Sequence, residues 1–317
     1  MLLSRLGWVF SIGLVIWGAS TACGQEFPNR PIRLITSLPG GGSDFAARLI
    51  AQGISGPLGQ PVIVENRPSN LTAEVAMKAQ PDGYTLLVEG NSFWVAPLLR
   101  NTPYQVLRDF TPVTIALTAP NILVMHPSVA ANSVGELIAL AKAKPGQLNY
   151  GSAGTGGSLH LAMEMFRSMA GIDIVHVPYK GIGAALTGLV AGEIQLLSST
   201  AAALAPFTKS GKLKALAVTT AKPSSLFPAL PTIASAVPGY ELVLRTGLFA
   251  VGKPPRSTIV RLNQEVVRTL NTAEIKDRFF NAGVETVGNT PEEFAAIIKS
   301  EIAAFSKVIK EAGIKAE

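Results

Sequence analysis

The chain has a single cysteine, Cys23, and only three histidines in 317 residues. One cysteine excludes an internal disulfide and leaves no residues for a cysteine-rich metal site. Charged residues make up only 15% of the chain, and the lysines and arginines behind its formal net charge of +6 are spread as singles and pairs. Without a basic stripe interleaved with aromatic residues, we expect no nucleic-acid binding, and a weak positive field favours small anions.

Motifs of common catalytic and nucleotide-binding sites are also missing. Gly151–Ser158 lacks the lysine of a phosphate-binding loop and the third glycine of a dinucleotide fingerprint. No serine lies in a GxSxG elbow, and His126, His160 and His176 do not have metal-ligand spacing. We therefore expect a protein that is not an enzyme and that holds no cofactor and no metal. The alternative, an exported enzyme acting on a carboxylate, would need a nucleophile–base pair that Ser158 and His160 cannot readily form within one helix.

The N-terminus predicts an export signal over residues 1–24. Arg5 precedes an uncharged stretch from Leu6 to Gln25, whose apolar part is followed by small residues. Cys23 after these small residues leaves a lipoprotein open, and a retained membrane anchor is a third alternative. The weakly apolar second half of the stretch favours cleavage, so we expect a periplasmic protein.

Apolar, β-branched runs alternate with amphipathic helical patterns along most of the chain. The expected strands are Ile32 to Thr36, Val62 to Glu65, Thr85 to Val88, Ile122 to Met125, Ile174 to Val177, Ile194 to Leu197, Leu213 to Thr219 and Leu242 to Ala250. The expected helices are Phe45 to Ser55, Thr72 to Ala79, Val134 to Ala143, Leu159 to Met169 and Gly183 to Ala191. This alternation predicts an α/β fold with mostly parallel sheets.

The C-terminal part, from Ser257 to Lys315, is almost entirely helical in pattern. The pattern breaks at Ala282–Gly283 and restarts at Thr290, which forms a capping box with Glu293. Helices of this kind usually cover a sheet that was built earlier in the chain.

The length of the chain suits two α/β lobes better than one small core. Two long extended segments, Thr111 to His126 and Tyr240 to Val251, have prolines at their ends and predict two parallel connectors that act as a hinge. We place the first lobe at residues 25–122 and 246–317 and the second lobe at residues 123–245.

Two loops of small residues share one design, in which a strand leads through the loop into a helix. Ser37 to Asp44 follows the first expected strand, and Gly151 to Ser158 precedes the expected helix at Leu159. The backbone amides of such a loop and the dipole of the helix after it favour a bound anion. Two such loops in separate lobes predict a cleft that holds a small anion from both sides.

Several residues near these loops also have a simpler explanation. Asp44 and Ser158 can act as N-caps of the helices, and His160 can be a packing histidine. Three consecutive glycines, Gly40–Gly42, exceed what a turn needs, so a close approach of the backbone to a ligand is the favoured interpretation. Tyr179 follows a strand of the second lobe and is expected at the same rim, where ligands of open α/β sheets bind.

Short motifs at these and other positions run in order through almost the whole chain after residue 24. They are Arg30-Pro31-Ile32-Arg33, Pro39-Gly40-Gly41-Gly42-Ser43-Asp44, Gly59-Gln60-Pro61-Val62, Glu65-Asn66-Arg67-Pro68, Pro81-Asp82-Gly83-Tyr84-Thr85-Leu86, Leu148-Asn149-Tyr150-Gly151-Ser152-Ala153-Gly154, His176-Val177-Pro178-Tyr179-Lys180-Gly181, Gly211-Lys212-Leu213, Pro231-Thr232 and Thr290-Pro291-Glu292-Glu293-Phe294. In these motifs the chain resembles the Bug receptors, the periplasmic substrate-binding proteins of tripartite tricarboxylate transporters.

The resemblance implies a two-lobed, Venus-flytrap fold of the type II-like periplasmic-binding-protein class, with two crossing hinge strands. It implies a solute receptor that binds a small organic carboxylate between its lobes and delivers it to the permease subunits of such a transporter. We expect a monomer. A sensory receptor that signals to a membrane partner stays open as an alternative.

Carried onto this sequence, the resemblance also implies ligand contacts in both lobes. We further expect apolar walls such as Phe93, Trp94 and Leu38 to set the shape of the pocket for the ligand's body. The first-lobe contacts are expected at Leu38, Gly41, Gly42, Ser43, Asp44, Asn70, Thr72, Asn91 and Ser92. The second-lobe contacts are expected at Ser152, Thr155, Gly157, Ser158, His160, Tyr179 and Ser199.

Two departures from the family pattern bear on the ligand. The loop after Arg67–Pro68, which is glycine-rich in the family, is shorter here and has no glycine. Ser198–Thr200 stand where the family often carries an aspartate that can meet an ammonium group. From this second departure we predict a weaker preference for amino acids than for simple carboxylates.

Overall fold

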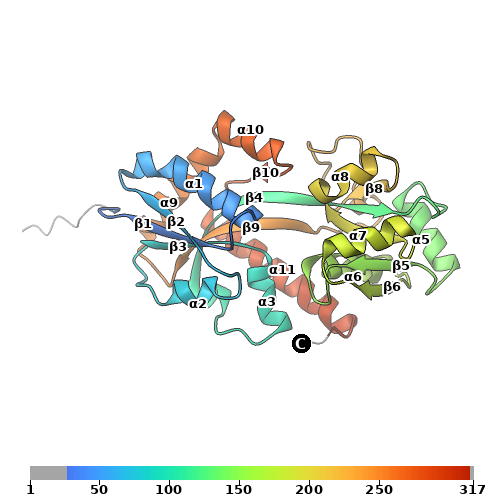
Figure 1. Ribbon diagram of the computed structural model, residues 1–317. Helices are drawn as coiled ribbons and strands as arrows, with labels where there is room; N and C mark the ends of the chain where they lie inside the picture. Colours follow the sequence, from blue (N-terminus) through green and yellow to red (C-terminus); the bar gives the residue numbers. More distant parts are fainter. Residues whose placement is uncertain (1–26, 315–317) are drawn as a thin grey trace, which may run out of the picture.

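The computed structural model describes residues 27–314, so the predicted signal peptide and Cys23 lie outside the described residues. Within this range one curved sheet runs through the length of the molecule in the strand order β2-β1-β3-β9-β4-β7-β5-β6 (Figure 1). Two short strands, β8 and β10, pair with β4 beside this path. Helices flank the sheet in both halves, which gives the expected α/β fold. The expectation of mostly parallel sheets is wrong, because four of the strand pairings are parallel and five, all involving β4 or β9, are antiparallel.

The first half of the sheet, which we call the first lobe, is built on a parallel pair of βα units. Strand β1 pairs in parallel with β2 and with β3, and β3 pairs antiparallel with β9. The strands are β1 (Ile32–Thr36), β2 (Val62–Asn66), β3 (Thr85–Gly90), β9 (Val243–Val251) and β10 (Glu285–Thr286). The helices are α1 (Gly42–Leu58), α2 (Thr72–Met77), α3 (Ser92–Leu99), α4 (Val106–Asp109), α9 (Arg256–Leu270), α10 (Ala273–Asn281) and α11 (Pro291–Glu311).

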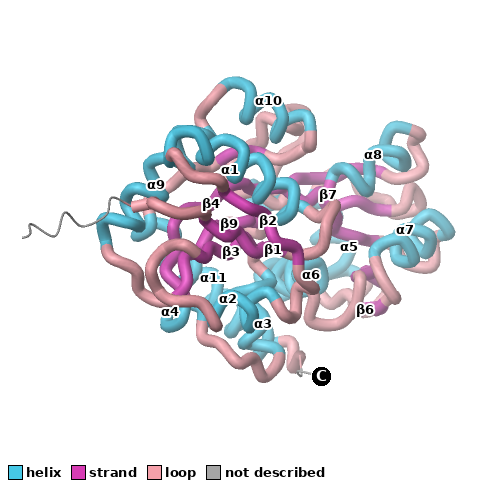
Figure 2. Tube along the Cα trace, turned by 60° about the vertical axis from the view of Figure 1, so that its left-hand side comes forward, coloured by secondary structure: helices cyan, strands magenta, loops and turns pink. Residues whose placement is uncertain are grey.

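The first-lobe strands are covered on both faces, because their apolar side chains point to both sides. Helices α1, α9 and α10 lie over one face, whereas α2, α3 and α11 lie over the other (Figure 2). The C-terminal helices therefore cover a sheet formed by the earlier part of the chain, as expected.

The second half of the sheet, the second lobe, has a parallel centre of its own. Strand β5 pairs in parallel with β6 and with β7, and β7 and β8 each pair antiparallel with β4. The strands are β5 (Asn149–Ser152), β6 (Val175–Pro178), β7 (Leu196–Thr200) and β8 (Lys214–Val218). The helices are α5 (Val134–Ala143), α6 (Ser158–Ala170), α7 (Ile182–Ala191), α8 (Ala201–Lys209) and the 3-10 turn η1 (Ile233–Ser235).

Strand β4 (Phe110–Met125) belongs to both lobes. Its residues 110–120 pair with β9, and its residues 121–125 pair with β7 and β8. The two predicted connectors are thus hydrogen-bonded to each other, but they run antiparallel and not parallel, because a chain that leaves a lobe and returns beside its exit must reverse direction. The exact residue boundaries of the lobes stay predictions.

Most expected elements are present, and the capping box at α11 is confirmed. The hydroxyl of Thr290 accepts from the Glu293 N–H at 3.2 Å, and the Glu293 carboxylate accepts from the Thr290 N–H at 2.9 Å. The sequence patterns missed α3, α4 and α8, and they missed a break between α9 and α10. Helices α3 and α8 contain Pro97 and Pro206, and internal prolines hide a helical pattern.

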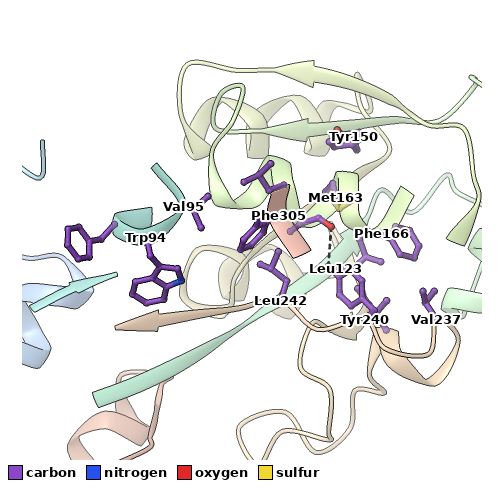
Figure 3. Close-up of a cluster of buried hydrophobic side chains, with 14 of the residues drawn as sticks. Trp94, Val95, Leu123, Tyr150, Met163, Phe166, Val237, Tyr240, Leu242 and Phe305 are labelled. Atoms are coloured by element: carbon purple, nitrogen blue, oxygen red, sulfur yellow. Dashed lines mark hydrogen bonds between the residues drawn. The ribbon is translucent and has the colours of Figure 1, made fainter. Parts of the chain in front are cut away.

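One cluster of buried apolar side chains extends through both lobes (Figure 3). Trp94 on α3 lies at its first-lobe end, and Tyr150, Phe166 and Tyr240 lie at its second-lobe end. Phe305 of α11 lies between them, and this helix contacts α3, α6 and β4. The C-terminal helix therefore packs against both lobes.

Close packing of α11 on the crossing strands gives a first prediction. A Cβ at Gly247 of β9 would lie 2.2 Å from Cζ of Phe294, a buried side chain of α11. We expect Gly247→Ala to lower the free energy of unfolding by about 1–3 kcal/mol, the usual cost of overpacking. Gly183→Ala is the matched control, since a Cβ on that exposed α7 glycine meets nothing within 4 Å. Urea unfolding measures both, and equal stabilities of the two variants would contradict this packing.

Candidate functional site

A cavity of about 380 Å³ lies between the lobes. Its first-lobe wall comes from the end of β3, from α3 and from the segment after it, and its second-lobe wall comes from the loop before α6. The lining residues are Ser69, Glu89, Asn91, Ser92, Phe93, Val95, Ala96, Leu99, Arg100, Tyr104, Thr155, Gly156, Gly157, Ser158, Leu161 and Phe305.

The start of α6 is the anion-binding feature of the second-lobe wall. Gly157 is the N-cap and Ser158 the first helical residue, and the first turn contains no acidic side chain. The first amides of a helix have no partner within it, and the helix dipole adds partial positive charge there. This end of α6 is therefore electrostatically unbalanced, and it lies at the cavity.

The loop before α6 is held in shape by its own amides. The Gly156 N–H donates to Nδ1 of His160 at 3.0 Å, and the Gly154 N–H donates to Oγ of Ser152 at 3.2 Å. Both glycines have positive φ, +137° at Gly154 and +78° at Gly156, which other residues rarely adopt. The amides of Gly154 and Gly156 are thus engaged within the loop, whereas the amides in the first turn of α6 are available to a ligand.

Two histidines support this loop from behind. The rings of His160 and His176 stack with centroids 3.8 Å apart, and Nε2 of His176 lies 2.7 Å from Oγ of Ser152. Burial lowers the pKa of His160 to about 4 and also lowers the pKa of His176. Neutral rings can accept a hydrogen bond, as Nδ1 of His160 does, so these residues position the loop without lining the cavity.

At the corresponding loop of the first lobe, a carboxylate of the protein itself neutralises the partial positive charge of the helix start. Asp44 lies in the first turn of α1 and accepts from the Gly40 N–H, from Arg48 and, at 2.7 Å, from Asn66. Burial alone would raise the pKa of Asp44, but these hydrogen bonds hold it below its usual value. Because an ionised side chain occupies this helix start, it attracts a second anion less than the start of α6 does.

The expected N-cap roles of Asp44 and Ser158 are wrong. Glycines occupy both N-cap positions, Gly41 before α1 and Gly157 before α6, and neither helix has a side-chain cap. Glycine is tolerated at an N-cap because it leaves the first amides accessible.

The first-lobe wall of the cavity holds two buried polar side chains, Glu89 and Asn91. Glu89, at the end of β3, is 5% exposed, and burial raises its pKa to about 7. Asn91, the N-cap residue of α3, donates from Nδ2 to the Val243 carbonyl at 3.2 Å. Glu89 is not among the residues expected at the site, although a lone acid at the end of an apolar strand was a signal for it.

Five of the expected contact residues line the cavity: Asn91, Ser92, Thr155, Gly157 and Ser158. Gly41, Gly42 and Ser43 lie at the start of α1, and Ser43 approaches the end of β3, because its Oγ would lie 4.0 Å from a Cβ at Gly90. The expected ligand contacts of all these residues stay predictions.

The other expected residues are not among the lining residues, although the Thr72 hydroxyl lies beside two of them, Ser69 and Glu89. Ser152 and His160 shape the loop, Thr72 donates its hydroxyl to the Ser69 carbonyl, and the Tyr179 hydroxyl donates to Glu193 at 3.3 Å. Asn70 is exposed, and Ser199 is buried on β7.

Only one of the three expected apolar walls lines the cavity. Phe93 does so, whereas Leu38 is 56% exposed away from the lining. Trp94 is fully buried and donates from Nε1 to Glu301 at 2.6 Å. Its indole therefore belongs to the core.

The fold and this interlobe cavity define a two-lobed periplasmic solute-binding protein. Residues 46–314 match the model of the tripartite tricarboxylate transporter family receptor, and the chain belongs to this family. BugT of Bordetella pertussis is 33% identical to it, over 99% of each chain. The family is transport-associated, so the protein is a solute receptor and not an enzyme.

Solved structures agree with this assignment. Rpa4515 of R. palustris with adipate is 34% identical, with a TM-score of 0.72 over 91% of this chain and 99% of that one. MatC from Rhodopseudomonas palustris with bound malate is 27% identical, with a TM-score of 0.68 over 89% of this chain and 100% of that one. Among residues 27–314, no helix is long and apolar enough to cross a membrane.

The neutral histidines behind the α6 loop give a second prediction. The unfolded chain binds a proton on His160 near pH 6.5, and the folded chain only near pH 4. The stability that His160 contributes is therefore complete above pH 6.5 and decreases as the pH falls to 4, by on the order of 3 kcal/mol. His160→Asn, which keeps an acceptor, should reduce this decrease, with His126→Asn as the control. Urea unfolding across this range measures it, and an unchanged pH dependence in His160→Asn would contradict the assignment.

Proposed function

We propose that this protein captures a small organic carboxylate in the cavity between its lobes and delivers it to the permease subunits of a tripartite tricarboxylate-type transporter. The observation that carries this proposal is the unbalanced N-terminus of α6 at the cavity wall. A carboxylate placed there would accept hydrogen bonds from amides that have no other partner. The relatives whose structures contain adipate and malate support the same ligand class.

Binding of useful strength requires both walls of the cavity. Micromolar capture needs about −8 kcal/mol. A helix start contributes about 0.3–1 kcal/mol, up to about 2 in a partly buried site, and each hydrogen bond to a charged group about 1.5–3 kcal/mol. Four to six donors are thus needed, which the α6 loop alone does not supply. We propose that one lobe captures the solute and the other closes over it, with β4 and β9 as the hinge.

The expected cellular route follows from this function. A receptor that works on the periplasmic side must be exported, and we propose that the signal peptide at residues 1–24 directs this export. Lipidation at Cys23 is an alternative to simple cleavage. We propose that the receptor acts as a monomer, so that a single closed molecule docks on the permease.

Blocking the start of α6 tests the proposal. Gly157 has a favourable φ of −68°, so a side chain can be added there without backbone strain, and it would project at the cavity wall. We expect the wild type to bind malate or adipate in calorimetry with a micromolar Kd and a raised Tm. Gly157→Leu should weaken this binding by about a hundredfold or more, because the side chain takes the place of the carboxylate.

The control is Gly135→Leu, the same substitution at an exposed position in the first turn of α5. It should leave binding unchanged. If no small organic acid raises the Tm of the wild type, the proposed function is wrong.

A further inference from the structure

The two walls of the cavity contain unsatisfied groups of opposite hydrogen-bonding character. The second-lobe wall presents donors, the free amides at the start of α6. The first-lobe wall includes Ser69, Ser92 and Arg100, whose side chains can donate, but its buried carboxyl is an acceptor: Oε1 of Glu89 has no hydrogen-bond partner among residues 27–314. A ligand that satisfies both walls must accept hydrogen bonds at one end and donate them at the other.

The described residues supply no cation for Glu89. None of the ion pairs in the described part of the chain includes this residue, and the one basic side chain at the cavity, Arg100, is exposed. The Tyr104 hydroxyl donates to the Phe93 carbonyl at 3.0 Å, so it does not serve the carboxyl either. The Thr72 side chain and the Gly90 N–H donate hydrogen bonds to the Glu89 carboxyl, but burial without a cation still disfavours its ionised form, and a cation brought by a ligand would offset this cost.

We infer that Glu89 selects the ligand by binding a protonated amine of a solute whose carboxylate lies at the start of α6. This inference rests on the proposed function and specifies its ligand class: a carboxylate that also carries an ammonium group. The charges then alternate across the cavity, from the positive helix start to the ligand carboxylate and from the ligand ammonium to Glu89. Pairing in a site shielded from water gives the charge-assisted hydrogen bonds that are stronger than neutral ones.

A second ligand carboxylate fits the first-lobe wall less well. Beside Glu89 it would place two acids in contact, and one of them would have to be protonated. Ser198–Thr200 led to the opposite expectation, a weaker preference for amino acids. That expectation assumes that the acid which binds the ammonium group in the family lies at these positions on β7. These residues do not line the cavity, and Glu89 offers a carboxylate from the opposite lobe. The two expectations therefore differ in a measurable way.

Calorimetry with matched ligand pairs tests the inference. The pairs are γ-aminobutyrate with succinate and ε-aminocaproate with adipate, in which a CH2NH3+ group replaces one carboxylate, and aspartate with malate, in which an ammonium replaces the hydroxyl. In at least one pair, we expect the wild type to bind the amine-bearing member about tenfold or more tightly than its partner. Glu89→Gln should remove this difference, chiefly by weakening the amine-bearing member.

Two further variants make the result specific. Glu74→Gln, an exposed acid on α2, should leave both members of each pair unchanged. Glu89→Asp keeps the charge but retracts it by one methylene, so it should retain part of the preference. Glu89→Gln removes a buried acid that has no cationic partner, and its Tm without ligand should equal or exceed that of the wild type above pH 7.

The possible outcomes distinguish the inference about Glu89 from the proposed function. If the dicarboxylates bind and the amines do not, or if Glu89→Gln binds an amine as tightly as the wild type, the inference is overturned while the proposed function stands. If no member of any pair binds, the proposed function fails and the inference fails with it. A preference that Glu89→Gln abolishes and Glu74→Gln preserves establishes the role of Glu89.

Discussion

The antiparallel pairing of β4 with β9 is the interaction on which the rest of the molecule depends. Along residues 110–120, β4 is hydrogen-bonded to β9, and beyond them the same strand becomes part of the second-lobe sheet. Both lobes are thus built on one continuous strand, and its buried side chains join their cores. Because the walls of the cavity come from elements attached to this strand pair, small changes in its twist alter the distance between them.

The chemistry of the cavity follows from an asymmetry between two similar loops. Both lead from a strand through small residues into a helix start, but only α1 carries an acid in its first turn. Asp44 neutralises its own helix start, and the absence of such an acid leaves α6 free for a ligand anion. Similar sequences at the two loops therefore have different electrostatic roles, and the first-lobe wall of the cavity comes mainly from β3 and α3.

Local patterns predicted the features that depend on local physics. Runs of β-branched residues marked the strands, and the Thr290–Glu293 capping box fixed the start of α11. The loop at Thr155–Ser158 was found because a small-residue turn before a helix needs no distant partner. Features that depend on distant residues were missed or misread: Asp44 accepts a hydrogen bond from Asn66, Trp94 is buried against α11, and Glu89 is enclosed by residues of several other segments. None of these partners is evident from one sequence.

Phe305 belongs both to the apolar cluster shared by the lobes and to the cavity lining. A cavity wall formed by a loop can move to accommodate a larger ligand. Phe305, however, is a buried aromatic side chain on the long helix α11, whose start is stabilised by a capping box. Accommodating a longer solute on this side would require repacking of the core, whose density resists displacement. The upper limit on solute length is thus coupled to the stability of the fold itself.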